Sequence, residues 1–490
     1  MNWQEAHRRN DLVRLATEAM IDRGLEAQFP PAVAQQLTTI TGPARETGAQ
    51  ISDLTALLWC SIDNDDSRDL DQLTACETLA DGSVRILVAV ADVDALVRKG
   101  SPIDEHARVN TTSVYTSAKI FPMLPERLST DLTSLNPDQD RLAVVTEMTI
   151  APDASVAHAS VRRARVRNQA KLAYDSVAAW IDGSGTLPEP ARAVRGLDEQ
   201  LRTQDAVAQR LRARRQAQGS LEFETFQPRA VFAGERVVDI RQQGQNRARQ
   251  LIQELMIGVN GCVAQFLADA GVASLRRVVR SPERWSRIVA LAQQYGESLP
   301  SVPDAASLEG FLARRRKADP VRFPDLSLVI VKLMGSGEYV AERPDGTSIG
   351  HFGLALRDYT HATAPNRRFP DLIALRLVKS VLAGSTPAYS LAELKELAAH
   401  CSRQEDAAQK VERRMRKSEA ALLLESHVGQ EYDGIVTGRT PRDTWVRIFQ
   451  PPVEGRLAAH GTELDVGQRI RVKLVSTDVE RGFIDFVLIE

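Results

Sequence analysis

Cysteine, net charge and long apolar runs are all scarce in this sequence of 490 residues. The four cysteines, Cys60, Cys76, Cys262 and Cys401, lie far apart without a Cys-x-x-Cys pair, which argues against a disulfide framework and the usual zinc spacings. Scattered thiols and the lack of a signal peptide favour a reducing compartment, so we expect a cytoplasmic protein. No apolar run approaches the roughly 18 residues of a membrane span, so we expect no membrane partner.

The formal net charge is only -2 at pH 7. A nucleic-acid partner would therefore have to be held by local basic patches or a lined channel rather than by bulk positive charge. Hydrophobic residues make up 43% of the chain and charged residues 26%, so the sequence can bury a sizeable core. Its length corresponds to about three domains of ordinary size.

What the sequence does have is a dense acidic stretch at residues 61–72, SIDNDDSRDLDQ. Asp63, Asp69 and Asp71 belong to a group of five aspartates within nine residues. Carboxylates this close repel one another and are costly to desolvate unless a cation joins them. Because no His or Cys lies among them, the oxygen ligands indicate Mg²⁺, Mn²⁺ or Ca²⁺ rather than zinc. A solvated acidic turn fits the composition equally well.

A helix-loop-helix calcium site is excluded by two positions of this stretch. Such a loop needs Gly at its sixth position and a bidentate Glu at its twelfth. Counted from Asp63, these positions hold Arg68 and Thr74.

A second stretch suited to chemistry lies at residues 364–371, APNRRFPD. Ala364-Pro365-Asn366 predicts a turn, and Pro370 is a good first residue for the helix that the following periodicity predicts. Arg367 and Arg368 therefore precede a helix N-terminus, where the dipole and free N–H groups favour an anion. The guanidinium fork can hold two phosphate oxygens. The alternative is a structural arginine bridging to Asp371.

The two ends of the chain differ in pattern from the middle. Residues 1–45 predict helices, either a structural arm or a helix-turn-helix module. Residues 84–93, VRILVAVADV, predict a buried strand. Residues 429–490 predict five short strands, which suit a small OB-type barrel. Trp445 could offer a stacking face there or belong to the barrel core.

These stretches resemble the RNase II (RNB) family of 3′→5′ exoribonucleases. The family has an Asp, a gap of five and then Asp-x-Asp-Asp, which Asp63, Asp69 and Asp71 match, with Gln72 in place of the fourth acid. Residues 120–125, IFPMLP, are similar to the family's Ile-Pro-Met-Leu-Pro segment. Residues 251–257, LIQELMI, are similar to its Leu-Ile-Glu-Glu-Leu-Met helix beside the RNA channel. Residues 364–371 resemble its Ser-Pro-Ile-Arg-Arg-Tyr-x-Asp block, and the resemblance covers roughly residues 50–490.

The resemblance implies an exoribonuclease that hydrolyses single-stranded RNA processively to nucleoside 5′-monophosphates. It implies Mg²⁺, with Mn²⁺ as an alternative, held by Asp63, Asp69 and Asp71, and it makes Asp71 and Arg367 catalytic. The RNA contacts that we expect are Tyr115, Arg368, Glu254 and Trp445. The family also carries a functional Glu late in the catalytic domain, for which Glu412 and Glu419 both remain candidates.

We expect an α+β protein with three parts. A helical segment spans 1–48, where the small RNA-binding barrels usual in the family have no room. A mixed catalytic domain spans 49–425, and an OB-fold RNA-binding domain spans 429–490. We expect a monomer without an obligate protein partner. The alternatives are an RNA-binding protein that has lost catalysis, marked by Gln72, and a DNA or tRNA-end nuclease on the same scaffold.

Overall fold

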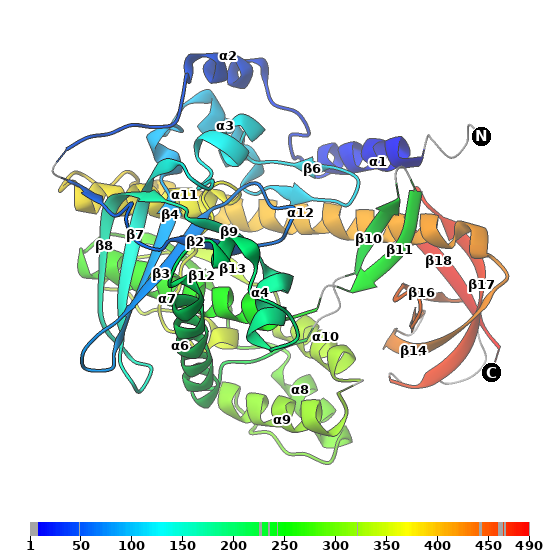
Figure 1. Ribbon diagram of the computed structural model, residues 1–490. Helices are drawn as coiled ribbons and strands as arrows, with labels where there is room; N and C mark the ends of the chain where they lie inside the picture. Colours follow the sequence, from blue (N-terminus) through cyan, green and yellow to red (C-terminus); the bar gives the residue numbers. More distant parts are fainter. Residues whose placement is uncertain are drawn as a thin grey trace.

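The computed structural model describes residues 8–48, 50–224, 228–233, 236–242, 244–320, 322–440, 443–458, 464 and 467–489. A mixed α and β body carries a long helix, α12 (Leu391–Leu424), which runs from the body to a barrel at the C-terminal end (Figure 1). The predicted α+β class is confirmed.

A seven-stranded mixed sheet forms the centre of the body, in the order β1-β8-β7-β4-β3-β2-β9. The strands are β1 (Ile51–Asp53), β2 (Cys60–Asp63), β3 (Gln72–Thr78), β4 (Val84–Ala91), β7 (Asp140–Ile150), β8 (Val156–Arg167) and β9 (Ala170–Ala173). The strand predicted at 84–93 is β4, and all its residues except Arg85 are buried, as apolar side chains on both faces require. Because β2 and β3 are antiparallel neighbours, their connection carries the acidic stretch at one end of the sheet.

Helix α7 (Arg247–Asp269) packs against the sheet and against three further helices, α4 (Tyr174–Ile181), α6 (Leu197–Ala217) and α11 (Phe369–Leu382). The helix is 23 residues long, and an 18-residue window within it has a mean hydropathy of 1.4, which would suffice for a membrane span. The prediction that no apolar run approaches such a length is therefore wrong for this helix. However, 56% of its apolar window is buried inside the protein, as in the core helix of a soluble protein. Its composition is therefore explained by packing.

Smaller elements surround the body. The helices are α3 (Pro102–Asn110), α4 (Tyr174–Ile181), α5 (Glu189–Arg192), α8 (Trp285–Gln294), α9 (Ala305–Ala318) and α10 (Phe323–Met334). A π-helix, η2 (Arg127–Leu132), and three 3-10 turns, η1 (Val93–Ala95), η3 (Phe352–Leu354) and η4 (Glu425–His427), accompany them. Three short antiparallel pairs join β5 (Val114–Tyr115) to β6 (Ile120–Phe121), β10 (Pro228–Ala233) to β11 (Arg236–Gln242) and β12 (Ser274–Val278) to β13 (Glu338–Glu342).

The N-terminal helices do not form a helix-turn-helix unit. Helix α1 (Arg8–Asp22) packs on α12, and its Leu12 and Leu15 share a core cluster with Val114 and Phe121 of the β5–β6 hairpin. Helix α2 (Pro31–Thr39) packs on α3 instead. A helix-turn-helix joins its two helices by a turn of three or four residues, whereas residues 23–30 separate these. The structural arm is therefore the better description.

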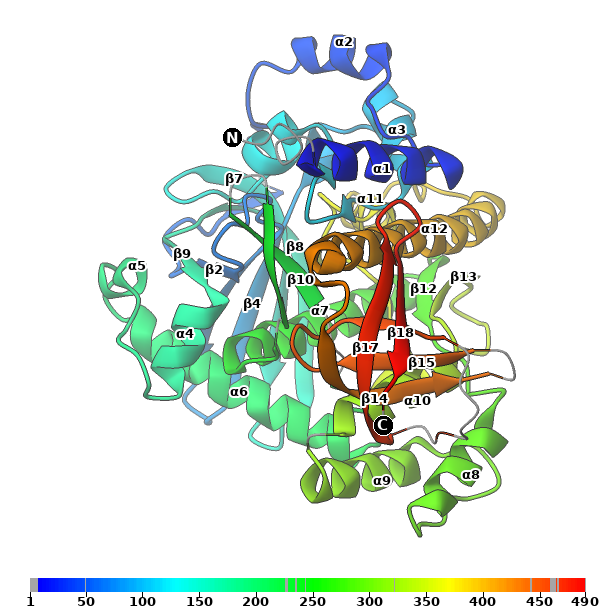
Figure 2. The same ribbon diagram turned by 90° about the vertical axis from the view of Figure 1, so that its right-hand side faces the viewer.

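The barrel closes from five strands, β14 (Glu431–Arg439), β15 (Thr444–Ile448), β16 (Glu454–Leu457), β17 (Arg469–Asp478) and β18 (Phe483–Leu488). The predicted OB-type architecture is confirmed. Val446, Val472 and Phe486 are fully buried in its core. The barrel and the β10–β11 hairpin both pack along the C-terminal half of α12 (Figure 2).

Candidate active site

Three predicted acidic residues lie at one end of the central sheet. Asp63 is the last residue of β2, and Asp71 immediately precedes β3, with Asp69 between them in the connecting loop. The backbone oxygen of Asp71 accepts from the N–H of Ala91 at 3.0 Å, which fixes this loop beside the end of β4.

Asp71 is the most buried of the three, with 2% of its surface exposed. Its Oδ1 accepts from the backbone N–H of Asn366 at 2.9 Å, and its Oδ2 accepts from Arg367 Nε at 3.1 Å. Burial raises the pKa of Asp71 to about 7, against the attraction of Arg367 and with added repulsion from Asp69. The carboxyl group is therefore short of positive charge even with an arginine in contact.

Asp63 and Asp69 also bond to groups of the protein. Asp63 Oδ1 accepts from Asn64 N–H at 2.9 Å and from Ser67 Oγ at 3.1 Å, while burial raises its pKa. Asp69 Oδ2 accepts from the hydroxyl of Tyr115 at 3.2 Å. Burial, together with the charge of Asp69, raises the pKa of this phenol, so Tyr115 stays protonated and donates.

Among the described residues, no group of three or more His, Cys, Asp or Glu side chains stands ready to hold a metal ion. The three carboxylates are instead each engaged by donors of the protein. Their chemistry nevertheless fits a hard divalent cation, because all their donor atoms are oxygens. A cation would also offset the burial that raises the pKa of Asp63 and Asp71. Asp63, Asp69 and Asp71 as a metal-binding set stay a prediction.

The two arginines of the second stretch have different roles. The backbone N–H groups of Arg367 and Arg368 donate to Ala364 O at 3.2 and 3.0 Å, so the predicted turn is confirmed, and α11 begins at Phe369. Arg367 points to Asp71 and keeps 41% of its side chain exposed. Arg368 bonds instead to the fully buried Asp371 at 2.8 Å. Arg368 thus forms the structural bridge to Asp371, and its RNA contact stays a prediction.

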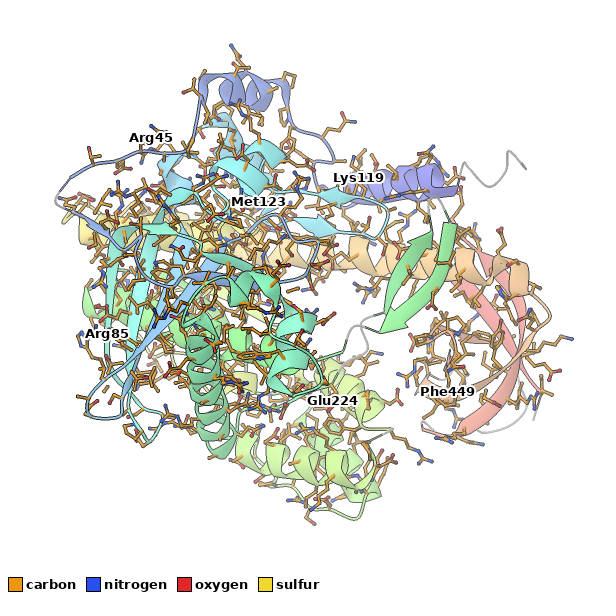
Figure 3. All side chains as sticks on the ribbon, viewed as in Figure 1. Arg45, Arg85, Lys119, Met123, Glu224 and Phe449 are labelled. Atoms are coloured by element: carbon orange, nitrogen blue, oxygen red, sulfur yellow. The ribbon has the colours of Figure 1, made fainter. Side chains whose placement is uncertain are left out.

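The β5–β6 hairpin brings Tyr115 to the acidic residues, and α12 holds it there. Glu412 accepts from the N–H of Tyr115 at 3.1 Å, and Glu419 accepts from Ser117 N–H at 3.2 Å and Ser117 Oγ at 2.9 Å. Figure 3 shows Lys119 of the same segment near α1 and Met123 further into the body. Burial raises the pKa of Glu412, and it raises that of Glu419 to about 7. Both candidate glutamates therefore position the Tyr115 hairpin.

Two other predicted RNA contacts lie away from this centre. Glu254 of α7 is 3% exposed and forms a two-pronged ion pair with Arg215 of α6, at 2.9 and 2.5 Å. Both carboxylate oxygens thus join α7 to α6, and the RNA contact of Glu254 stays a prediction. Trp445 lies on β15 with Lys417 of α12 5.4 Å from its ring, so it faces the helix that carries the barrel. Its stacking role stays a prediction.

Several residues at the site were not foreseen from the sequence. Ser134 Oγ donates to Arg68 O at 2.8 Å and accepts from Leu70 N–H at 3.0 Å, which holds the acidic loop in place. Arg249, in the first turn of α7, donates to Asn64 Oδ1 at 2.9 Å. A lone serine or arginine gives no sequence signal, although the nearby family-like segment at 251–257 pointed to this helix.

Two protein-family models together match most of this chain. Residues 51–384 match the RNB domain, and residues 430–489 match the RNase II-type exonuclease C-terminal S1 domain. Ribonuclease R of Escherichia coli is 31% identical over 503 residues, covering 94% of this chain and 60% of that protein. The chain spans about 60% of the length of the curated relatives that it matches first.

Solved structures share the fold. Mycoplasma genitalium RNase R in complex with ribose methylated single-stranded RNA has a TM-score of 0.87 at 21% identity, covering 98% of this chain and 78% of that one. Yeast Ssd1, a pseudonuclease, has a TM-score of 0.69 at 18% identity, covering 88% of this chain and 53% of that one.

Proposed function

Because this chain belongs to the RNB family of the RNase II and RNase R type, we propose that it is a 3′→5′ exoribonuclease that hydrolyses single-stranded RNA to nucleoside 5′-monophosphates. One observation carries the proposal: Asp71 and Arg367, 296 positions apart in the chain, bond to each other beside Asp63 and Asp69. We place this activity in the cytoplasm, carried out by a monomer. Processive action also belongs to the proposal.

The buried acids supply the chemistry together with a divalent cation. A cation held by Asp63, Asp69 and Asp71 would polarise the scissile phosphate and lower the pKa of an attacking water. Arg367, with its half-exposed side chain, neutralises the charge that grows on the phosphate oxygens. The hydrogen bond from Asn366 N–H keeps Asp71 aimed at the same point.

The Tyr115 hairpin supplies the RNA contact nearest to the centre. Its hydroxyl is fixed on Asp69, which sets the ring at the edge of the acidic site. An aromatic ring there would stack on a base, a contact worth about 1–3 kcal/mol that does not depend on sequence. The bound single-stranded RNA of the Mycoplasma genitalium enzyme supports this class of substrate.

An RNA-binding protein without catalysis is the second candidate, because one acid of the family pattern is Gln72 here. Yeast Ssd1, a pseudonuclease, has the same fold, so the scaffold alone does not imply cleavage. Against this stands the retention of Asp71 with Arg367 in contact, an arrangement that a pure binder does not need.

The deciding experiment uses 5′-labelled single-stranded RNA, Mg²⁺ and the full chain. We expect labelled fragments that shorten from the 3′ end, and no cleavage with EDTA. Asp71→Asn is the matched control, because the amide keeps the shape but not the charge. RNA binding without shortening would make the protein a binder. Turnover by Asp71→Asn within a few-fold of wild type would place catalysis elsewhere.

A further inference from the structure

A second charged cavity, of about 500 Å³, lies at the C-terminal end of α11. Its charged lining residues come from the segment after β4, from β8 and from α11, and they are Asp94, Arg98, Lys99, Arg162, Arg163, Arg376 and Lys379. Lys379 lies ten residues beyond Phe369, about 15 Å along the helix at 1.5 Å per residue. The cavity is therefore separate from the Asp71–Arg367 centre.

The cations of the lining pair with acids, of which, among the described residues, Asp94 alone lines the cavity; Lys99 contacts Glu393 at 2.7 Å and Arg163 contacts Glu46 at 2.8 Å. Arg376 bonds to Asp94 at 2.9 Å and to Asp104 at 2.7 Å, while Lys379 contacts Asp92 at 2.7 Å and Asp94 at 2.8 Å. The side chains of these three aspartates are only 0 to 11% exposed. Six cationic side chains thus line the cavity against one acid, although each of the six has an acidic partner.

Two partly exposed arginines of the cavity, Arg98 and Arg162, have N–H donors available to a ligand. Arg98 is 64% exposed; its ion pair with Asp94 is 3.5 Å long, longer than a good hydrogen bond, and its charge also helps to lower the pKa of Glu46. Arg162 is 37% exposed and donates from Nη2 to Glu147 at 2.8 Å; its Nε is buried without a partner among the described residues, so a ligand would meet the remaining N–H groups of this fork. Both guanidinium groups can therefore donate hydrogen bonds to a further anionic ligand.

We propose that this cavity binds a small phosphate-bearing anion of nucleotide size. The planar guanidinium fork matches phosphate oxygens, and two forks face one space. The cavity volume falls within the range of about 300–1,000 Å³ that is usual for small-molecule sites. Leu382, Ala383 and Ala388 give an apolar wall for a sugar or base, and Gln50 adds a polar group.

The test is calorimetric titration of the full chain, in EDTA, with pyrophosphate and with AMP. EDTA keeps divalent cations from recruiting phosphate to the acidic centre. The variant is Arg98→Gln with Arg162→Gln, which leaves no acid unpaired, because Asp94 keeps Arg376 and Lys379 and Glu147 keeps Arg85. We expect saturable binding by wild type that weakens at least tenfold in the variant, with the thermal midpoint unchanged.

Arg280→Gln with Arg314→Gln is the matched control. These arginines are 56% and 61% exposed and line none of this cavity, so the same charge is removed elsewhere. Binding by this control should stay within twofold of wild type. Equal binding by wild type and the Arg98/Arg162 variant, or no saturable binding by wild type, overturns the proposal. A single-stranded oligonucleotide that competes better than AMP would identify an RNA backbone as the source of the phosphate.

Discussion

The two ends of α11 bury acidic residues in opposite ways. At the N-terminal end, Asp71 has one arginine in contact, and burial raises its pKa to about 7. At the C-terminal end, burial acts on Asp94 in the same direction, but Lys379 and Arg376 outweigh it and the pKa is lowered. The difference between the two sites is the supply of positive charge, because both carboxyl groups are removed from water.

This contrast distinguishes a structural network whose charges are already paired from a site whose acidic groups need a ligand. A buried acid with its counter-ions in place adds to the fold, whereas one without them raises the cost of folding. Perturbed carboxyl groups that the protein does not neutralise are typical of functional sites. The contrast supports the proposal that Asp94 has a structural role and Asp71 a catalytic one.

The largest expected effect on stability comes from Asp94→Asn. This change removes the acid that Lys379 and Arg376 share and leaves each with one aspartate, Asp92 or Asp104, and breaking a buried pair costs about 3–5 kcal/mol. Urea unfolding at pH 7 in EDTA measures the loss. Asp71→Asn under the same conditions should lose far less, because it removes a charge that burial already disfavours. Equal losses in the two variants would remove the contrast.

The next largest effect is expected on rate, from Arg367→Lys. A point ammonium cannot reproduce the planar contact that Arg367 makes with Asp71 and would make with phosphate. We expect the rate to fall by about 10²-fold, as when one oxyanion donor is removed, with RNA affinity within a few-fold of wild type. Single-turnover rates and binding isotherms measure the two quantities. A full rate for Lys with a slow Arg367→Ala would show that charge alone matters.

Much of the fold was predictable from local sequence patterns. The buried strand at 84–93, the turn before α11 and the five-stranded barrel follow from local periodicity and turn chemistry, which one sequence carries. The pairing of Asp71 with Arg367 could be expected only through the resemblance, because it joins residues 296 positions apart.

The ion-pair partners of two predicted RNA contacts could not be foreseen. Glu254 pairs with Arg215 and Arg368 pairs with Asp371 inside the fold, and their RNA contacts stay predictions. Sequence shows which residues carry charge but not which charges cancel across the fold. The same limit hid the cationic cavity, whose lining comes from three separate segments.

Glu419→Gln tests whether a buried carboxyl group with a raised pKa lowers stability, at a residue outside the proposed metal-binding set. Its folded pKa of about 7 lies above the ordinary value of 4.5, so the wild type loses stability as pH rises from about 4.5 to 7. The glutamine variant does not titrate. Its stability relative to wild type should therefore rise over that window by about 3 kcal/mol and then level off. Unfolding free energies across pH 4 to 9 measure this, and a difference independent of pH would contradict it.

The smallest effect is expected from Gln72→Asp. This change restores the fourth acid of the family pattern and adds one negative charge next to Asp71. Greater negative charge holds divalent cations more tightly. The Mg²⁺ concentration for half-maximal activity should therefore fall by a few-fold. Superimposable titrations of rate against Mg²⁺ would show that Gln72 lies outside the metal site.

The central claim is that the acidic centre lacks positive charge that a divalent cation supplies. Thermal unfolding of wild type and Asp71→Asn, each in EDTA and in Mg²⁺, tests it without relying on activity. A ligand at about 100 times its Kd stabilises the folded state by about 2.7 kcal/mol. The account predicts that Mg²⁺ raises the midpoint of wild type by several degrees and that of Asp71→Asn much less. Equal shifts in both proteins, or no shift in wild type, would contradict it.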